Sequence, residues 1–63
     1  MKKEKLPRDI KGKLLSRGDF VTRDIMGKRD HGIVNRIVYG HVIDVRVDDG
    51  LLRTASFLWR KED

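Results

Sequence analysis

The spacing of apolar residues changes early in the chain, and the change separates two kinds of local structure. Leu6, Ile10 and Leu14 recur at every fourth position, which predicts a short helix or turn over residues 7–16 with one apolar face. Pro7 suits the first turn of such a helix. Further along, apolar residues recur at every second position, which is the period of a β-strand.

The alternating part predicts four short strands, at residues 19–23, 32–38, 42–47 and 51–57. In the third strand, alternation places Ile43 and Val45 on one face and Asp44 on the other. The pair Asp49–Gly50 predicts a tight hairpin after it, because both central positions of a type I′ turn need positive φ.

Antiparallel hairpins of this kind stack as a sandwich or curl into a barrel, and so few strands favour the barrel, which also hides strand edges. The predicted fold is therefore mainly β, a small SH3-like antiparallel β-barrel of four to five strands with a short N-terminal helix or basic arm. The expected organisation is an arm at residues 1–17, a barrel at 18–60 and a charged end at 61–63.

Aromatic residues are few, and their positions suggest different roles. Phe20, Phe57 and Trp59 are expected in the core, because a chain with only four aromatic residues can leave few of them on its surface. Tyr39 stands beside Gly40 and is expected at a hairpin tip, where its ring stays exposed and can stack on a base or anchor a protein.

Three short segments carry a family resemblance: Gly18-Asp19-Phe20-Val21, Gly32-Ile33-Val34 and Gly40-His41-Val42-Ile43-Asp44-Val45. Together they resemble the turn glycines and core valines of small β-barrels of the Src-homology, Tudor and KOW type, over residues 18–59. The KOW-like branch implies contact with RNA, ribosomes or RNA polymerase. The other two branches imply peptide recognition, but the chain lacks the aromatic cluster that a peptide reader carries between its first two strands.

The length of 63 residues allows one domain with a small core, and the absence of cysteine excludes disulfides and thiolate metal sites. The remaining sources of stability are a very regular fold or burial against a partner. No apolar run is long enough to span a bilayer, and the N-terminus lacks the apolar stretch of a secretory signal. We expect a cytoplasmic protein that is a monomer or weak homodimer, with residues 1–5 disordered.

The net charge of +5 arises entirely in the first 17 residues, which hold seven bases and two acids, whereas the rest holds eight of each. A polyanion is therefore expected to meet the arm first. A solvated tail that only aids solubility explains the same composition. The candidate contacts to nucleic acid or a partner are the bases of the arm, two loop bases, three strand arginines and one tyrosine: Lys2, Lys3, Lys5, Arg8, Lys11, Lys13, Arg17, Lys28, Arg29, Arg36, Arg46, Arg53 and Tyr39.

Catalytic patterns are nearly absent from the sequence. Ser16 and Ser56 lie in no nucleophile motif, and His31 and His41 lack the spacing of a metal site. The acids at residues 48–49 are explained by turn chemistry as well as by cation binding. We therefore expect neither catalysis nor a cofactor.

Three hypotheses remain for the function. The first is a non-catalytic barrel that binds nucleic acid or a nucleoprotein machine, with a role in transcription or translation. The second is a protein-interaction module, such as a small phage-encoded inhibitor or accessory factor of a host enzyme like RNA polymerase. The third is a homodimer that covers the apolar side chains of Leu51, Leu52 and Leu58.

Overall fold

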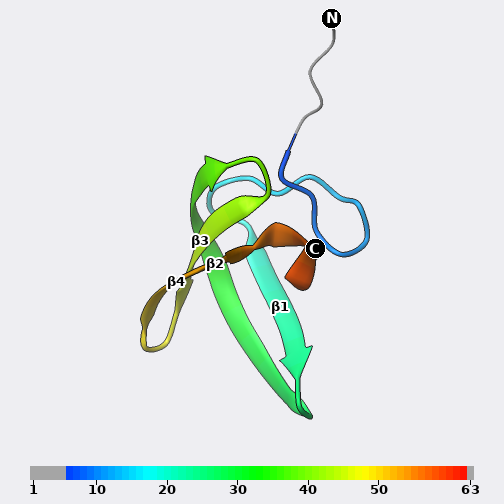
Figure 1. Cartoon of the computed structure of the whole chain (residues 1–63). Coiled ribbons are helices and arrows are strands. Elements are labelled where there is room, and N and C mark those ends of the chain that lie inside the picture. Colours follow the sequence, from blue (N-terminus) through cyan, green and yellow to red (C-terminus); the bar gives the residue numbers. More distant parts are fainter. Residues whose placement is uncertain (1–5, 63) are drawn as a thin grey trace, which may run out of the picture.

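The computed structural model describes residues 6–62, so the disorder expected for residues 1–5 concerns a part outside this range. The described chain forms one antiparallel sheet of five strands in the order β4-β3-β2-β1-β5 (Figure 1). The elements are β1 (Phe20–Ile25), β2 (Lys28–Tyr39), β3 (Val42–Val47), β4 (Gly50–Ala55), a 3₁₀ turn η1 (Ser56–Leu58) and β5 (Arg60–Lys61). The prediction of a mainly β fold is confirmed. Within residues 6–62, no helix is long and apolar enough to cross a membrane.

The hairpin turns differ from the predicted ones. Met26 and Gly27 join β1 to β2, and their φ angles of 50° and 81° give the two positive values of a type I′ turn. Between β3 and β4, Val47 pairs with Gly50, so the central residues are at 48–49 and neither has positive φ. The predicted type I′ turn at Asp49–Gly50 is therefore wrong, because Gly50, with φ of 130°, already begins β4.

The long strand β2 connects the two halves of the sheet. Its first half pairs with β1 and its second half with β3, and the register with β3 shifts at Asn35 and again at Val38. Such irregularities bend a strand and increase its twist. The sheet is consequently curved, and the bend of β2 can be followed in Figure 1.

The curled sheet does not close into a barrel, which corrects the predicted fold. β4 and β5 lie at opposite edges of the sheet, and no ladder joins them within residues 6–62. β4 leads directly into η1, and β5 has only two residues, which pair with Val21 and Thr22 of β1. This edge strand is too short to complete a ring of hydrogen bonds.

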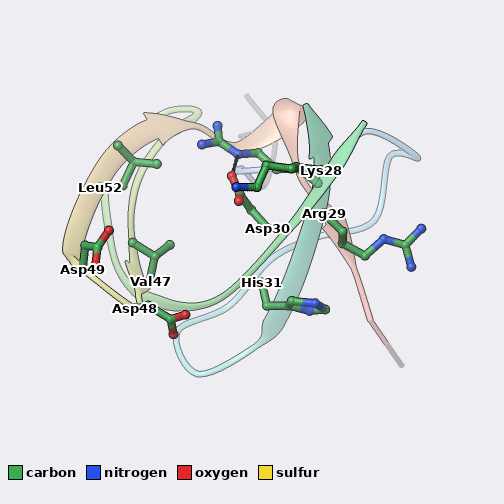
Figure 2. A pocket seen from close by; sticks show the side chains of 9 residues that line it. Lys28, Arg29, Asp30, His31, Val47, Asp48, Asp49 and Leu52 are labelled. Carbon is green, nitrogen blue, oxygen red and sulfur yellow. Dashed lines mark hydrogen bonds and ion pairs between the residues drawn. The ribbon is translucent and has the colours of Figure 1, made fainter. Parts of the chain in front are cut away.

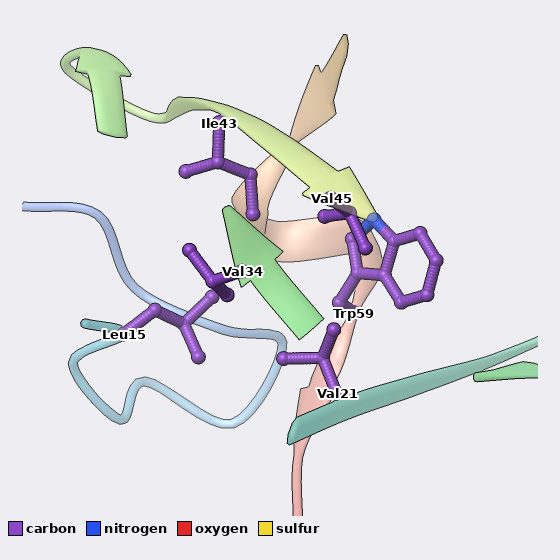
Figure 3. Packing of buried hydrophobic residues seen from close by; sticks show 6 residues of the cluster. All are labelled: Leu15, Val21, Val34, Ile43, Val45 and Trp59. Atoms are coloured by element: carbon purple, nitrogen blue, oxygen red, sulfur yellow. The ribbon is translucent and has the colours of Figure 1, made fainter. Parts of the chain in front are cut away.

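The core fills the concave side of the sheet (Figure 3). Trp59 is fully buried, as predicted, and packs with aliphatic side chains from the first three strands and from the N-terminal segment: Leu15, Val21, Val34, Ile43 and Val45. Phe20 and Phe57 are 62% and 52% exposed, so their predicted place in the core is wrong. Phe20 precedes the buried Val21 on β1, and alternation turns its ring to the opposite face.

Of the short helix or turn predicted over residues 7–16, the helix does not form, and residues 10–11 make a turn. The buried carboxylate of Asp9 accepts the backbone N–H groups of Lys11 at 2.9 Å and Lys13 at 2.7 Å, which closes a tight loop in place of a helical turn. An isolated bridge joins Arg8 to Leu14 across this loop. The segment is attached to the sheet, because the N–H of Ile10 donates to the carbonyl of Trp59 at 2.8 Å.

Candidate functional site

The convex side of β2, β3 and β4 carries most of the features that point to a binding surface, and we call it the outer face. Strand alternation and cross-strand pairing define its nine side chains: Ile33, Arg36 and Tyr39 on β2, Val42, Asp44 and Arg46 on β3, and Leu51, Arg53 and Ala55 on β4. Three arginines face one aspartate in this set. The outer face is therefore positively charged even though residues 18–63 are neutral in sum.

Asp44 lies between two of these arginines, in the same cross-strand row. Its carboxylate accepts a hydrogen bond from Nε of Arg53 at 2.9 Å and lies 3.3 Å from Nε of Arg36. The hydrogen bonds and charge of Arg53, followed by those of Arg36, hold the pKa of Asp44 below its ordinary value. The Asp44 side chain is only 9% exposed, whereas both arginines are 58% exposed. The pair of guanidinium groups is thus oriented by one carboxylate and still faces solvent.

Arg46 occupies the next outward position of β3, opposite Ile33 on one side and Leu51 on the other. Among the residues that the structure describes, it has no ion-pair partner. It lines a hollow of about 270 Å³ together with Phe20 and Ile33, and a second hollow of about 230 Å³ together with Arg17. Because Arg46 is exposed, its side chain is accessible to a ligand.

Exposed rings and apolar side chains surround the arginines. Tyr39 is 70% exposed and ends β2, as predicted for a hairpin tip. Asp44 raises the pKa of the Arg53 guanidinium, and the nearby Tyr39 adds a smaller effect in the same direction. Phe20 pairs with Ile33 across β1 and β2 and so extends the outer face by one strand. Leu51 is 60% exposed at the other end of the same row.

The remaining predicted contacts lie elsewhere. Lys2, Lys3 and Lys5 lie outside the described residues. Lys11 and Lys13 are exposed on the N-terminal loop, and Arg8 is half-buried there with its Nη1 donating to the carbonyl of Gly12 at 2.8 Å. The structure therefore places Arg36, Arg46, Arg53 and Tyr39 together, with Arg17 beside them, and separates them from the rest of the arm.

Lys28 and Arg29 begin β2 at the open end of the sheet, where they line a hollow of about 420 Å³ (Figure 2). Arg29 pairs with Asp24 at 3.0 Å, and this ion pair raises the pKa of Arg29 and lowers that of Asp24. The acids Asp30, Asp48 and Asp49 line the same hollow. This mixture of charges gives the hollow no clear preference for an anion or a cation.

In the described part of the chain, neither histidine belongs to a cluster of metal-ligating side chains. Nδ1 of His41 lies 3.1 Å from Oγ of Ser56, but this hydroxyl is buried and donates to the carbonyl of Arg8 at 2.7 Å. These contacts attach the N-terminal loop to the turn before β3. Across residues 6–62, no three histidine or carboxylate side chains come together as metal ligands would.

Reasoning from the sequence missed two contributors to the outer face, Phe20 and Leu51. The scarcity of aromatic residues favours Phe20 in the core, although period-two alternation allows only one of Phe20 and Val21 to face inward. Leu51, considered only for a dimer, lies on the outer face, whereas the adjacent Leu52 packs against the core.

Comparison with protein-family models, curated proteins and solved structures finds no match for this chain.

Proposed function

We propose that this protein is a non-catalytic binding module for nucleic acid, alone or within a nucleoprotein machine of transcription or translation. The observation that carries the proposal is the outer face, where three arginines are exposed and two of them, Arg36 and Arg53, form ion pairs with the nearly buried carboxylate of Asp44. Arginine is the side chain best suited to phosphate, because its planar guanidinium presents several donors. Exposed rings on the same face add surfaces on which bases can stack.

The N-terminal bases extend the positive surface in this proposal. Arg17 lines a hollow with Arg46, which brings the arm and the outer face together at one point. We also propose that the curled sheet is an open relative of the Src-homology-like barrels, a relation supported by its single five-strand antiparallel sheet and the 3₁₀ turn before the last strand.

Salt-dependent binding tests the proposal. The affinity of labelled DNA and RNA oligonucleotides is measured by fluorescence anisotropy between about 50 and 200 mM salt. Arg46→Gln is expected to weaken binding and to reduce the slope of log affinity against log salt, by about 0.9 for duplex DNA and about 0.7 for a single strand, for each phosphate that the variant no longer neutralises. Lys28→Gln is the control, because it removes one positive charge at the start of β2, in a hollow that no outer-face side chain lines. Absence of binding to any oligonucleotide at low salt would reject the function.

A protein partner is the second candidate, favoured by the exposed apolar side chains of Phe20, Ile33 and Leu51 within one cross-strand row. Such a row resembles the apolar centre of a protein interface. A larger enzyme such as RNA polymerase is the proposed class of partner. Stoichiometric capture of one protein from nuclease-treated lysate, lost in Leu51→Asp, would favour this candidate over nucleic acid.

A further inference from the structure

The aromatic residues of this chain fall into two groups by their surroundings. Trp59 is fully buried beneath the guanidinium of Arg23, and the ring of Phe57 makes an edge contact with His41 at 5.7 Å between centroids. Tyr39 and Phe20 have no such ring partner within residues 6–62, and both are more than half exposed. The two free rings are therefore those that border the arginines of the outer face.

The register of the sheet fixes how these rings and arginines are spaced. Tyr39 pairs with Val42, and Ile33, the partner of Phe20, pairs with Arg46. Val42 and Arg46 are four residues apart on β3, which corresponds to about 13 Å along an extended strand. The guanidinium groups of Arg36 and Arg53 lie in the row between these positions. The order across the face is thus ring, guanidinium pair, ring.

We infer that the outer face binds nucleic acid as a single strand, with separate bases stacked on Tyr39 and Phe20 and the intervening phosphates held by Arg36 and Arg53. This inference rests on the proposed function and narrows its ligand. Stacking needs bases whose faces are free, and a duplex hides those faces inside its own stack. A duplex could use only the arginines, so the two rings would contribute nothing to its binding.

The ion pairs with Asp44 prepare the arginines for this role. Arg53 donates Nε and Nη2 to the carboxylate, and Arg36 directs Nε toward it, so other N–H groups on both guanidiniums remain available. Because the side chains are already oriented, less rotamer freedom is lost when a phosphate binds. The stacked bases need no specific edge contact, so we expect little sequence preference.

The test compares one mixed-sequence strand with the same strand annealed to its complement, as DNA and as RNA, in the full chain at constant salt. The single strand is expected to bind more tightly than the duplex. Tyr39→Leu and Phe20→Leu are each expected to weaken single-strand binding roughly tenfold and to leave duplex binding unchanged. Ile10→Ala, an exposed apolar residue on the N-terminal loop, is the control and should change neither.

A second readout uses the fact that Tyr39 is the only tyrosine of the chain. Its ring protons should shift upfield when the single strand is added, as ring currents of a stacked base require, and should not shift with the duplex. Equal binding of single strand and duplex, unaffected by Tyr39→Leu, would overturn the inference while leaving the proposed function in place. Failure of both forms to bind would reject the proposed function itself.

Discussion

Oδ2 of Asp9 accepts the backbone N–H of Lys61 at 2.8 Å, a hydrogen bond between residues 52 positions apart in the sequence. The other carboxylate oxygen accepts the N–H groups of Lys11 and Lys13. Asp9 is only 3% exposed, so these bonds form away from solvent. One side chain thereby closes the N-terminal loop and attaches it to the edge strand β5.

Asp9→Asn is expected to destabilise the fold by about 2–3 kcal/mol, because an amide nitrogen would face the N–H of Lys61 and a charge-assisted hydrogen bond would be lost. Urea unfolding followed by the fluorescence of Trp59 measures the effect. Asp24→Asn is the control, since Asp24 forms an exposed ion pair that contributes little. Equal stability of the two variants would show that the buried carboxylate is not an anchor.

Acid should weaken the same anchor. Burial raises the pKa of Asp9, but the hydrogen bonds from Lys61, Lys13 and Lys11 outweigh it and lower the pKa below its ordinary value. A lowered folded-state pKa stabilises the fold above the unfolded pKa of about 3.9, and this stabilisation is lost as the pH falls through the folded-state value. The difference in unfolding free energy between wild type and Asp9→Asn should therefore be full at neutral pH and shrink below about pH 4. A difference independent of pH would contradict this assignment.

Met26→Asn should stabilise the protein by about 0.5–1 kcal/mol, because asparagine tolerates the positive φ of the β1–β2 turn better than methionine. Met26 is 96% exposed, so almost no packing is lost. Thermal unfolding compares it with Asp48→Asn in the other turn, where φ is not positive and no gain is expected. A gain from both substitutions would point to a general effect of asparagine.

Gly32→Ala should cost about 1–3 kcal/mol through overpacking. A Cβ at this position would collide with Cγ1 of Val45 and lie 3.0 Å from the carbonyl oxygen of Arg46. Ile33→Ala, which shortens a partly exposed side chain at the next position, should cost less in the same unfolding assay. The reverse order would mean that the sheet adjusts freely at Gly32.

Asp44→Asn tests the electrostatics of the outer face. Removing the only negative charge among the nine outer-face side chains should strengthen single-strand binding a few-fold and steepen its salt dependence. Anisotropy titrations at two salt concentrations measure both quantities. Weaker binding would show that orientation of Arg36 and Arg53 by the carboxylate matters more than its charge.

Local patterns predicted the regular part of the fold well. β3 occupies the predicted residues, and its alternation correctly places Ile43 and Val45 in the core and Asp44 on the outer face. The same regularity aligned the strand arginines, because outward positions on neighbouring strands fall into rows. The burial of Trp59 and exposure of Tyr39 also followed from sequence.

Features that depend on distant partners could not be predicted in this way. The spacing of Leu6, Ile10 and Leu14 fits a helix, yet the segment follows the hydrogen bonds of Asp9, one of which comes from Lys61. The failure of the sheet to close likewise depends on β5, which has only two residues and pairs with β1 alone. Neither contact leaves a periodic signal in the chain.

The two-residue connections of the sheet have a consequence for the order of folding. Pairing across Ile25 and Lys28, Tyr39 and Val42, and Val47 and Gly50 needs only local chain closure. Docking β5 on β1 joins segments about 40 residues apart, as in the hydrogen bond of 2.6 Å between Thr22 and Glu62, and costs a larger loop entropy. We expect the meander β1 to β4 to form first and the two chain ends to dock last. The same ends would then open first under stress, which would expose Trp59 while the arginine-bearing strands remain paired.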